Sequence, residues 1–369
     1  MSAMAKTVLV AGASGVVGQA AVEHFAKLPE WSVVAVTRRA PLVRASSAWK
    51  HVPLDLTDAA ACRAAVAAMP RVTHLVYGAL HEKPELVAGW RDPQQMTTNL
   101  AMLRNLVEPL VDLGALEHVT LLQGTKAYGV HLHRIAVPAR EKWPRDDHEN
   151  FYWLQEDFLR DIAARKNFAF TIFRPQIIFG DAIGAAMNIM TVLGAYAAIR
   201  REEGLPFSYP GGSDYLLEAV DARLLARAFA WAAEAPAARG ETFNFTNGDV
   251  FVWRNVWPAI ASALTIAPGE PEPLRLAEYL PTRANIWRSI AKRNGLVEPD
   301  LGKLVGRSAE YADYCMASLT GRAAPPALVS TIKIRQAGFG DCIDTEDMFR
   351  DLFAAMIEKR ILPSLRSFA

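Results

Sequence analysis

The stretch Lys6–Gly18, with the sequence KTVLVAGASGVVG, decides the fold of this chain. An apolar, β-branched run ends at Gly12, and apolar residues then recur at helical spacing from Val16 onward. This pattern predicts a strand, a tight turn and a helix. The glycines stand three residues apart, which suits a turn, a close backbone approach to a pyrophosphate and close packing of helix on strand. We predict cofactor contacts from Gly12, Ser14, Gly15, Val16, Val17 and Gly18.

Further strand and helix patterns alternate along the chain. Strands are predicted at 32–37, 51–54, 72–77, 118–122, 168–174 and 241–246. Such alternation is typical of an α/β protein with a Rossmann-type, doubly wound parallel sheet. A segment rich in proline and glutamate, Pro268–Pro273, reads as a linker into a helical lobe. We expect residues 1–180 and 215–264 to form the NADP-binding core, and residues 181–214 and 265–369 a smaller, mainly helical, substrate-capping lobe with a terminal helix.

The cofactor preference is predicted from the end of the second strand. Arg38 and Arg39 stand about twenty residues beyond the last glycine, where an NAD enzyme places an acidic residue on the ribose hydroxyls. A guanidinium offers forked donors to a 2′-phosphate, which an acidic side chain would repel. The pair therefore predicts NADPH, with a solvated basic turn as the alternative.

Other cofactor contacts are expected at the carboxyl ends of later strands, where ligands collect in such sheets. Asp55 and Leu56 follow the third predicted strand, and Asp55 either bonds the adenine amino group or caps a nearby turn. Small residues end the next predicted strand, 72–77, and leave room for the adenosine half of the cofactor. The remaining predicted contacts are Gly78, Ala79, Gln123, Pro175 and Ile178.

A tyrosine and a lysine are the candidate catalytic residues. Short-chain dehydrogenases carry Tyr-x-x-x-Lys on one helix, but here Tyr152 is followed by Glu156 at the lysine position. Lys126, after the strand 118–122, is the replacement candidate, and both residues are also expected to contact the cofactor. A nearby ammonium lowers a tyrosine pKa, which suits an acid and oxyanion stabiliser. The alternatives are an interface tyrosine and a solvated surface lysine.

Composition restricts the partners. The 369 residues carry a net charge of +1, so no broad field favours nucleic acid or an anionic membrane. No secretory signal is recognised, and the apolar run 185–199 is too short to span a bilayer. Three widely spaced cysteines have no metal-ligand spacing, so we expect no metal site. We expect a cytoplasmic protein with a small-molecule partner, and the sequence is compatible with a homodimer.

The sequence resembles the progesterone 5β-reductase and iridoid synthase-like family, atypical members of the extended short-chain dehydrogenases, over nearly its whole length. The specific segments are Gly124-Thr125-Lys126, Asn150-Phe151-Tyr152 and Asn247-Gly248-Asp249. Plant members carry a second tyrosine where this chain has Trp153, and an aromatic loop residue where it has the stretch 129–131. These departures leave the substrate open. Weaker matches are the glycine loop, Arg38-Arg39, Asp55-Leu56, Glu156-Asp157, Arg174-Pro175, Gly180, Asn244, Val250-Phe251, Trp253, Gly338-Phe339 and Asp344–Phe349.

The resemblance implies NADPH-dependent 1,4-reduction of an enone or enal, with hydride going to the β-carbon. It implies that Tyr152 stabilises the enolate oxygen and that Lys126 supports the tyrosine and the cofactor. Two other functions stay open. The same tyrosine would serve a carbonyl 1,2-reductase or alcohol dehydrogenase, and a non-catalytic NADP-binding regulator needs the nucleotide site alone.

Overall fold

The computed structural model describes residues 6–43, 46–83, 89–319 and 325–364. The chain divides into two compact units, each of which gathers several segments of sequence. The first unit comprises 1–176, 222–245 and 329–341. The second comprises 177–221, 246–328 and 342–369.

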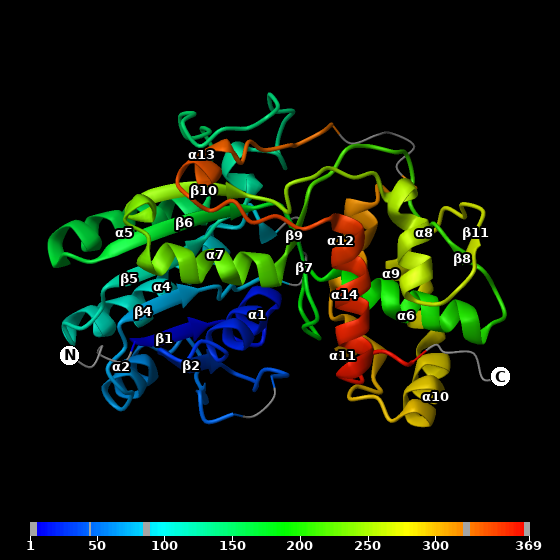
Figure 1. Ribbon diagram of the computed structural model, residues 1–369, viewed down its shortest axis with the longest axis horizontal. Helices are drawn as coiled ribbons and strands as arrows, with labels where there is room; N and C mark the ends of the chain where they lie inside the picture. The colour runs from blue at the N-terminus through cyan, green and yellow to red at the C-terminus, as the bar shows by residue number, and fades with distance from the viewer. Residues whose placement is uncertain (1–5, 44–45, 84–88, 320–324, 365–369) are drawn as a thin grey trace. The chain divides into compact units, whose positions relative to one another are not determined.

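A seven-stranded parallel sheet forms the centre of the first unit (Figure 1). The strand order is β10-β6-β5-β4-β1-β2-β3, so the order reverses between β1 and β4. Ligands bind such sheets outside the carboxyl ends of the strands near this reversal. The predicted Rossmann-type sheet is confirmed. Its strands are β1 Lys6–Ala11, β2 Trp31–Thr37, β3 Trp49–Pro53, β4 His74–Tyr77, β5 His118–Leu122, β6 Ala169–Pro175 and β10 Glu241–Phe245.

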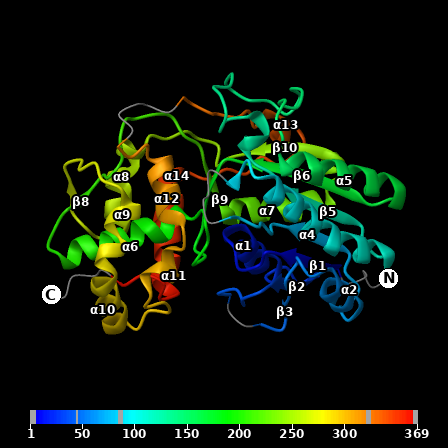
Figure 2. The ribbon, with the colours of Figure 1, turned by 180° about the vertical axis from the view of Figure 1, so that it is seen from behind.

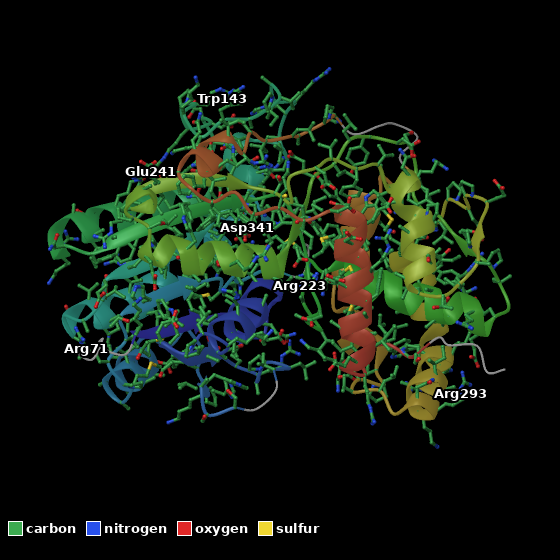
Figure 3. The ribbon with its side chains drawn as sticks, viewed as in Figure 1. Arg71, Trp143, Arg223, Glu241, Arg293 and Asp341 are labelled. Carbon is green, nitrogen blue, oxygen red and sulfur yellow. The ribbon has the colours of Figure 1, made fainter. Side chains whose placement is uncertain are left out.

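Helices cover both faces of this sheet. α1 and α7 pack together on one face, and α2, α4 and α5 lie on the other (Figures 1 and 2). The apolar core includes Leu9, Leu75, Leu103 and Ile172, all fully buried. At the β10 edge, Glu241 forms an ion pair with Lys333 of α13 at 2.7 Å; Figure 3 labels Glu241. The helices are α1 Val16–Phe25, α2 Ala59–Ala67, α4 Pro93–Asp112, α5 Phe151–Lys166, α7 Ala222–Glu234 and α13 Ile332–Gln336, with short 3-10 turns η1 Thr125–Tyr128 and η2 Pro236–Ala238.

The second unit is mainly helical. Its core holds Trp253 edge-on to Phe179, with ring centroids 6.0 Å apart, and a stacked pair of Phe207 and Trp257. Its strands form two short parallel pairs, β7 Ile177–Phe179 with β9 Ala219–Asp221 and β8 Phe207–Ser208 with β11 Pro268–Gly269. The helical elements are α6 Ile189–Glu202, α8 Trp253–Ala263, α9 Leu276–Tyr279, η3 Pro281–Arg283, α10 Ala284–Asn294, α11 Leu301–Val305, α12 Ser308–Cys315 and α14 Thr345–Glu358.

Two local predictions need revision. The predicted linker Pro268–Pro273 begins with β11, whose pairing with β8 explains why it is ordered. The sequence also predicts a helical stretch over 84–113. Residues 84–88 lie outside the described residues, and α4 begins only at Pro93. Asp92 sets this start because its carboxylate accepts a hydrogen bond from Gln95 N at 2.9 Å.

Two buried histidines make the first unit sensitive to acid. His74 begins β4 and His118 begins β5, and their rings lie 6.2 Å apart. Burial lowers the pKa of His74 to about 4 and that of His118 to about 3. Both rings are therefore neutral in the folded protein, whereas the unfolded chain protonates them below about pH 6.5. Stability that depends on these neutral rings is lost as the pH falls.

We predict that the free energy of unfolding decreases as the pH is lowered from 7 to 4. The unfolded chain binds protons at these two histidines, whereas the folded protein keeps both rings neutral. Each histidine therefore lowers the free energy of unfolding by up to about 1.4 kcal/mol per pH unit below pH 6. Urea unfolding at several pH values measures the slope. His118→Gln keeps a polar group facing Thr171 but cannot titrate, so it should flatten the slope; an unchanged slope would contradict the assignment.

Candidate active site

The glycine loop has the geometry that a pyrophosphate requires. Gly12 has φ +79°, and a Cβ there would lie 2.8 Å from backbone atoms of Ala79. A Cβ on Gly18 would lie 2.2 Å from the Gly12 carbonyl oxygen. Gly15 is the N-cap of α1 and makes no side-chain hydrogen bond to the first turn. The loop, including Ser14, Val16 and Val17, fits a dinucleotide at the helix N-terminus.

The predicted phosphate clamp lies beside this loop. Ser14 Oγ and Thr37 Oγ1 are 2.8 Å apart, which joins the glycine loop to the end of β2. Arg38 and Arg39 follow Thr37 and are both exposed. Arg38 also lies close enough to Asp55 for its charge to act on that carboxylate. The arginines therefore border the expected ribose position.

Asp55 caps a turn. Its Oδ1 accepts hydrogen bonds from Thr57 N at 2.9 Å and Thr57 Oγ1 at 2.8 Å. These bonds are the main cause of its lowered pKa, to which the Arg38 charge adds. Leu56 lies in the core, and its carbonyl accepts a hydrogen bond from Asn105. Of the two alternatives for Asp55, the turn cap is observed; a bond to adenine stays a prediction.

Glu156, at the position of the usual helical lysine, belongs to a buried polar network. Its Oε2 accepts a hydrogen bond from Gln123 Nε2 at 2.9 Å and lies 3.6 Å from Arg174 Nη2. Arg160 Nε donates to Oε1 at 2.9 Å. Burial raises the pKa of Glu156, but these donors outweigh it and lower the pKa overall. The residue is a structural carboxylate that ties α5 to the sheet.

Gln123 and Arg174 complete this network. Gln123 Oε1 accepts from Arg174 Nε at 2.8 Å, and Gln123 Nε2 also lies 3.3 Å from the Tyr152 carbonyl. Gln123 was predicted as a cofactor contact, but both ends of its side chain bond protein groups. Its role in the structure is to position the start of α5. Arg174 is a buried ion-pair partner of Glu156.

The Tyr152 hydroxyl lies at the carboxyl ends of β5 and β6. A Cβ on Gly124 would come within 3.1 Å of this hydroxyl and 3.6 Å of the Pro175 carbonyl oxygen. Gly124 therefore leaves the space that the phenol occupies, and Pro175 borders the same position. Ile178, another predicted contact, lies in β7 of the second unit.

Lys126 is half-buried on η1 beside the same strand end. Its Nζ lies 3.9 Å from the centroid of the Trp90 ring, which is a close cation–π contact. Burial lowers the pKa of Lys126 to about 8, and the negative charge of Glu82 opposes that shift. Its ammonium therefore rests against an aromatic ring, and its catalytic role stays a prediction.

The pKa of Tyr152 shifts opposite to the predicted lowering, and Lys126 is not among the groups that shift it. Burial, followed by the negative charge of Glu82, raises the pKa of Tyr152, and only Arg174 acts against the shift. The hydroxyl therefore keeps its proton well above neutral pH and is a hydrogen-bond donor. The pairing of Lys126 with Tyr152 in catalysis stays a prediction.

Sequence reasoning missed Glu82 and Trp90, which flank the candidate pair. Glu82 follows β4, and its Oε2 accepts from Gln95 Nε2 at 2.9 Å. Asn99 is fully buried and holds this segment, because it accepts from His81 N at 2.8 Å and donates to His81 O at 2.9 Å. The position of Glu82 after a strand end was the available signal. For Trp90 the sequence offered none.

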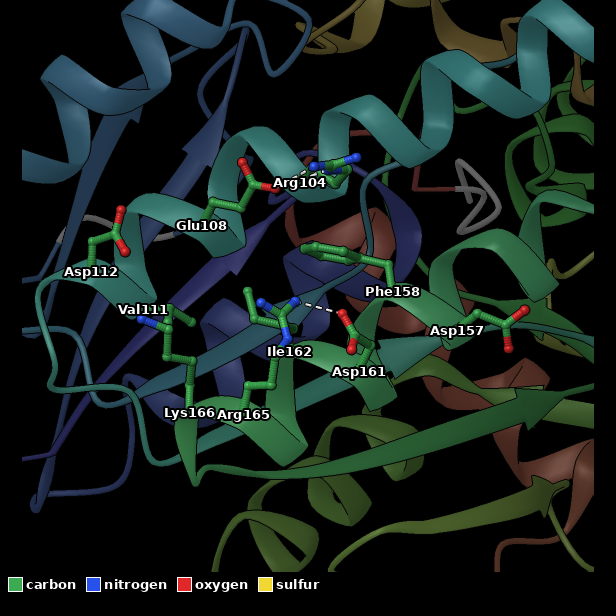
Figure 4. Close-up of a pocket in the computed structure, with 10 residues that line it drawn as sticks. All are labelled: Arg104, Glu108, Val111, Asp112, Asp157, Phe158, Asp161, Ile162, Arg165 and Lys166. Atoms are coloured by element: carbon green, nitrogen blue, oxygen red, sulfur yellow. Dashed lines mark hydrogen bonds and ion pairs between the residues drawn. The ribbon is translucent and has the colours of Figure 1, made fainter.

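The hollow in Figure 4 is separate from these residues. Its volume is about 590 Å³, and its walls come from the outer sides of α4 and α5. None of the predicted site residues lines it. Its lining residues are Arg104, Glu108, Val111, Asp112, Asp157, Phe158, Asp161, Ile162, Arg165 and Lys166.

Metal ligands and membrane helices are both missing from the described part of the chain. Among these residues, no group of three or more histidine, cysteine, aspartate or glutamate side chains is placed to hold a metal ion. No helix in the described ranges combines the length and apolarity needed to cross a membrane. Cys62, Cys315 and Cys342 are free thiols, and burial raises the pKa of the first two.

Solved structures resemble the whole chain. A UDP-glucose 4-epimerase covers 96% of this chain and 98% of its own, with TM-score 0.67 and 15% identity. The UDP-glucose 4-epimerase of Thermus thermophilus, solved with NAD, gives TM-score 0.65 and 18% identity over 95% and 99% of the two chains. At this identity the likeness establishes the fold. The fold agrees with the extended short-chain dehydrogenase/reductase type that the motifs resemble.

The sequence comparisons are more specific. The model of the PRISE-like Rossmann-fold domain matches residues 8–319, and the chain belongs to this family. It is 30% identical to the (S)-8-oxocitronellyl enol synthase of Antirrhinum majus over 96% of this chain and 92% of the relative. It is 32% identical to the 3-oxo-Delta(4,5)-steroid 5-beta-reductase of Arabidopsis thaliana over 79% of each. The resemblance stated from the motifs is confirmed, and the chain is an oxidoreductase of the extended class.

We predict that Gly15→Ala weakens dinucleotide binding by at least about tenfold while the fold persists. Gly15 has φ −83°, which alanine adopts, and its Cβ would meet only the Gly12 carbonyl at 3.3 Å. The methyl would occupy the approach to the helix N-terminus. Fluorescence titration with NADPH and thermal melting measure the two effects. Gly18→Ala, which overlaps Gly12, should instead lower the melting temperature; tight binding by Gly15→Ala would refute the loop assignment.

Proposed function

We propose that this protein is an NADPH-dependent reductase of activated C=C bonds in enones or enals. The observation that carries the proposal is the buried Tyr152 hydroxyl above Gly124, with Lys126 supplied from the end of β5 and Glu156 at the usual lysine position. NADPH would supply a hydride to the β-carbon of the substrate. The names of the related steroid 5-beta-reductase and enol synthases support this reaction class.

The tyrosine suits the charge that develops in conjugate reduction. When hydride adds to the β-carbon, negative charge moves to the carbonyl oxygen and forms an enolate. A hydroxyl that keeps its proton donates a hydrogen bond to this oxygen. An enolate is much less basic than an alkoxide, so a donor that resists ionisation is sufficient. A tyrosine acting as base in alcohol oxidation needs the opposite shift in pKa.

Lys126 would support this charge from a half-buried position. Its pKa of about 8 leaves most of it cationic at neutral pH, and Glu82 favours the charged form. A positive charge in a site of low dielectric stabilises an oxyanion more than it does in water. We further propose that Lys126 contacts the nicotinamide ribose. The final proton on the α-carbon would come from water.

The choice of NADPH rests on Arg38 and Arg39. Both are exposed beside the glycine loop, where a 2′-phosphate would meet forked donors. The pyrophosphate would rest on the first turn of α1, with Gly78 and Ala79 beside Gly12 leaving room for the adenosine half.

We predict that the protein oxidises NADPH in the presence of a small cyclic enone and yields the saturated ketone. The loss of absorbance at the nicotinamide band gives the rate, and chromatography identifies the product. An allylic alcohol would instead favour 1,2-reduction. No oxidation with any enone or carbonyl of a broad panel would leave a non-catalytic NADP-binding protein.

We predict that Tyr152→Phe lowers kcat by about a hundredfold or more and changes NADPH affinity little, because it removes only the donor to the developing charge. Tyr128→Phe is the matched control, since that hydroxyl already bonds Asn244 at 2.7 Å; it should reduce stability but spare turnover. Steady-state assays and NADPH titrations separate the effects. Turnover at the wild-type rate would remove Tyr152 from the mechanism.

We predict that Arg38→Ala weakens NADPH binding by about tenfold to a hundredfold, as expected for the loss of a charged hydrogen bond. NADH lacks the 2′-phosphate, so its affinity should change little. Dissociation constants for both cofactors provide the measurement. Equal losses for the two would contradict the phosphate clamp.

A further inference from the structure

The side chain of Asn150 connects the backbones of both candidate catalytic residues. Asn150 is the N-cap of α5, and its Oδ1 accepts a hydrogen bond from Tyr152 N at 3.0 Å. Its Nδ2 lies 3.4 Å from the Lys126 carbonyl oxygen. The orientation of this one amide therefore affects the start of α5 and η1 together.

The hydrogen-bond directions around Asn150 are fixed by elimination. A backbone N–H can only donate, so the Asn150 atom that faces Tyr152 N is the oxygen. The amide nitrogen then faces His148 Nε2, at 3.1 Å, and it can only donate. His148 Nε2 must therefore accept, and the ring carries its proton on Nδ1.

Asp146 holds His148 in this tautomer. His148 Nδ1 donates to Asp146 Oδ1 at 2.7 Å, and the His148 side chain is only 8% exposed. The ring packs edge-on to His131, at 5.4 Å between centroids, and to Trp153, at 6.1 Å. The polar contacts thus form one directed chain from Asp146 through His148 to Asn150.

The other oxygen of Asp146 contacts a second histidine. His133 Nε2 lies 2.8 Å from Oδ2, and its side chain is 50% exposed. Gly129 makes room for this pair, because a Cβ there would lie 2.8 Å from Asp146 Oδ1 and its φ is +73°. His133 resembles His148 in chemistry, but its other ring nitrogen faces the Arg134 carbonyl rather than Asn150.

We propose that Asp146 and His148 are positioning residues that orient Asn150 and thereby hold the Tyr152 and Lys126 backbones in their working arrangement. Neither is among the residues proposed to contact the substrate or the cofactor. The effect on catalysis rests on the proposed function, whereas the effect on the start of α5 is independent of it.

Two substitutions at His148 separate hydrogen bonding from packing. His148→Phe keeps an aromatic ring between His131 and Trp153 but removes both polar contacts. His148→Gln loses the ring but retains one acceptor for Asn150 and one donor for Asp146. His133→Phe removes a histidine of equal size from the same carboxylate and leaves the directed chain intact.

The first measurement is hydrogen exchange by mass spectrometry on the full-length protein. His148→Phe should raise the exchange rate in the peptide that contains the Tyr152 amide by about tenfold, because Asn150 is then free to turn away from it. His148→Gln and His133→Phe should leave that rate within about twofold of the wild type. This result is obtained without any substrate.

The second measurement is NADPH oxidation with 2-cyclohexen-1-one, with NADPH affinity measured in parallel. We expect His148→Phe to lower kcat by about tenfold or more with little change in NADPH affinity, and His148→Gln to recover most of the rate. His133→Phe should match the wild type.

The outcomes distinguish this inference from the proposed function. Protected exchange in His148→Phe, or equal defects in His148→Phe and His148→Gln, would overturn the positioning role. If the wild type fails to oxidise NADPH with any enone, the proposed function fails, and the exchange rates alone decide the positioning role. If exchange rises but kcat does not fall, the chain orders α5 without supporting catalysis, and the inference is overturned.

Discussion

The buried contact of Glu156 with Gln123 and Arg174 is the constraint on which the candidate site depends. It joins α5 to the carboxyl ends of β5 and β6, the three elements that meet at the Tyr152 hydroxyl. Removing one partner of a buried ion pair typically costs about 3–5 kcal/mol, because the other charge is left without compensation. The network thus fixes the tyrosine above Gly124 by means of groups that take no part in the chemistry.

The same network accounts for the absence of the usual lysine at the position of Glu156. In the usual arrangement the position of Glu156 supplies a cation to the cofactor and the tyrosine, but here it neutralises arginines. Lys126 reaches the site region from η1 instead, and its ammonium rests against Trp90. The pKa of the tyrosine is raised, and the pKa of the lysine is lowered to about 8.

The sequence predicted the elements that depend on local chemistry. The glycine loop, the parallel strands and the arginines after β2 follow from spacing and residue type, and the family motifs led to the right relatives. The pKa shift of Tyr152 could not be predicted, since it depends on burial and on Glu82, which is seventy positions away in the sequence. Similarly, the hydrogen bonds of the Gln123 amide with Glu156 and Arg174 could not be predicted, because they join distant parts of the sequence; its contact with the cofactor stays a prediction.

The network around Glu156 also limits which substitutions the site can accept. A lysine at this position would place a fourth cation among Arg145, Arg160 and Arg174, so one substitution cannot restore the ordinary Tyr-x-x-x-Lys arrangement. A lysine there would also leave Gln123 Nε2 and Arg160 Nε without the carboxylate oxygens that accept their hydrogen bonds.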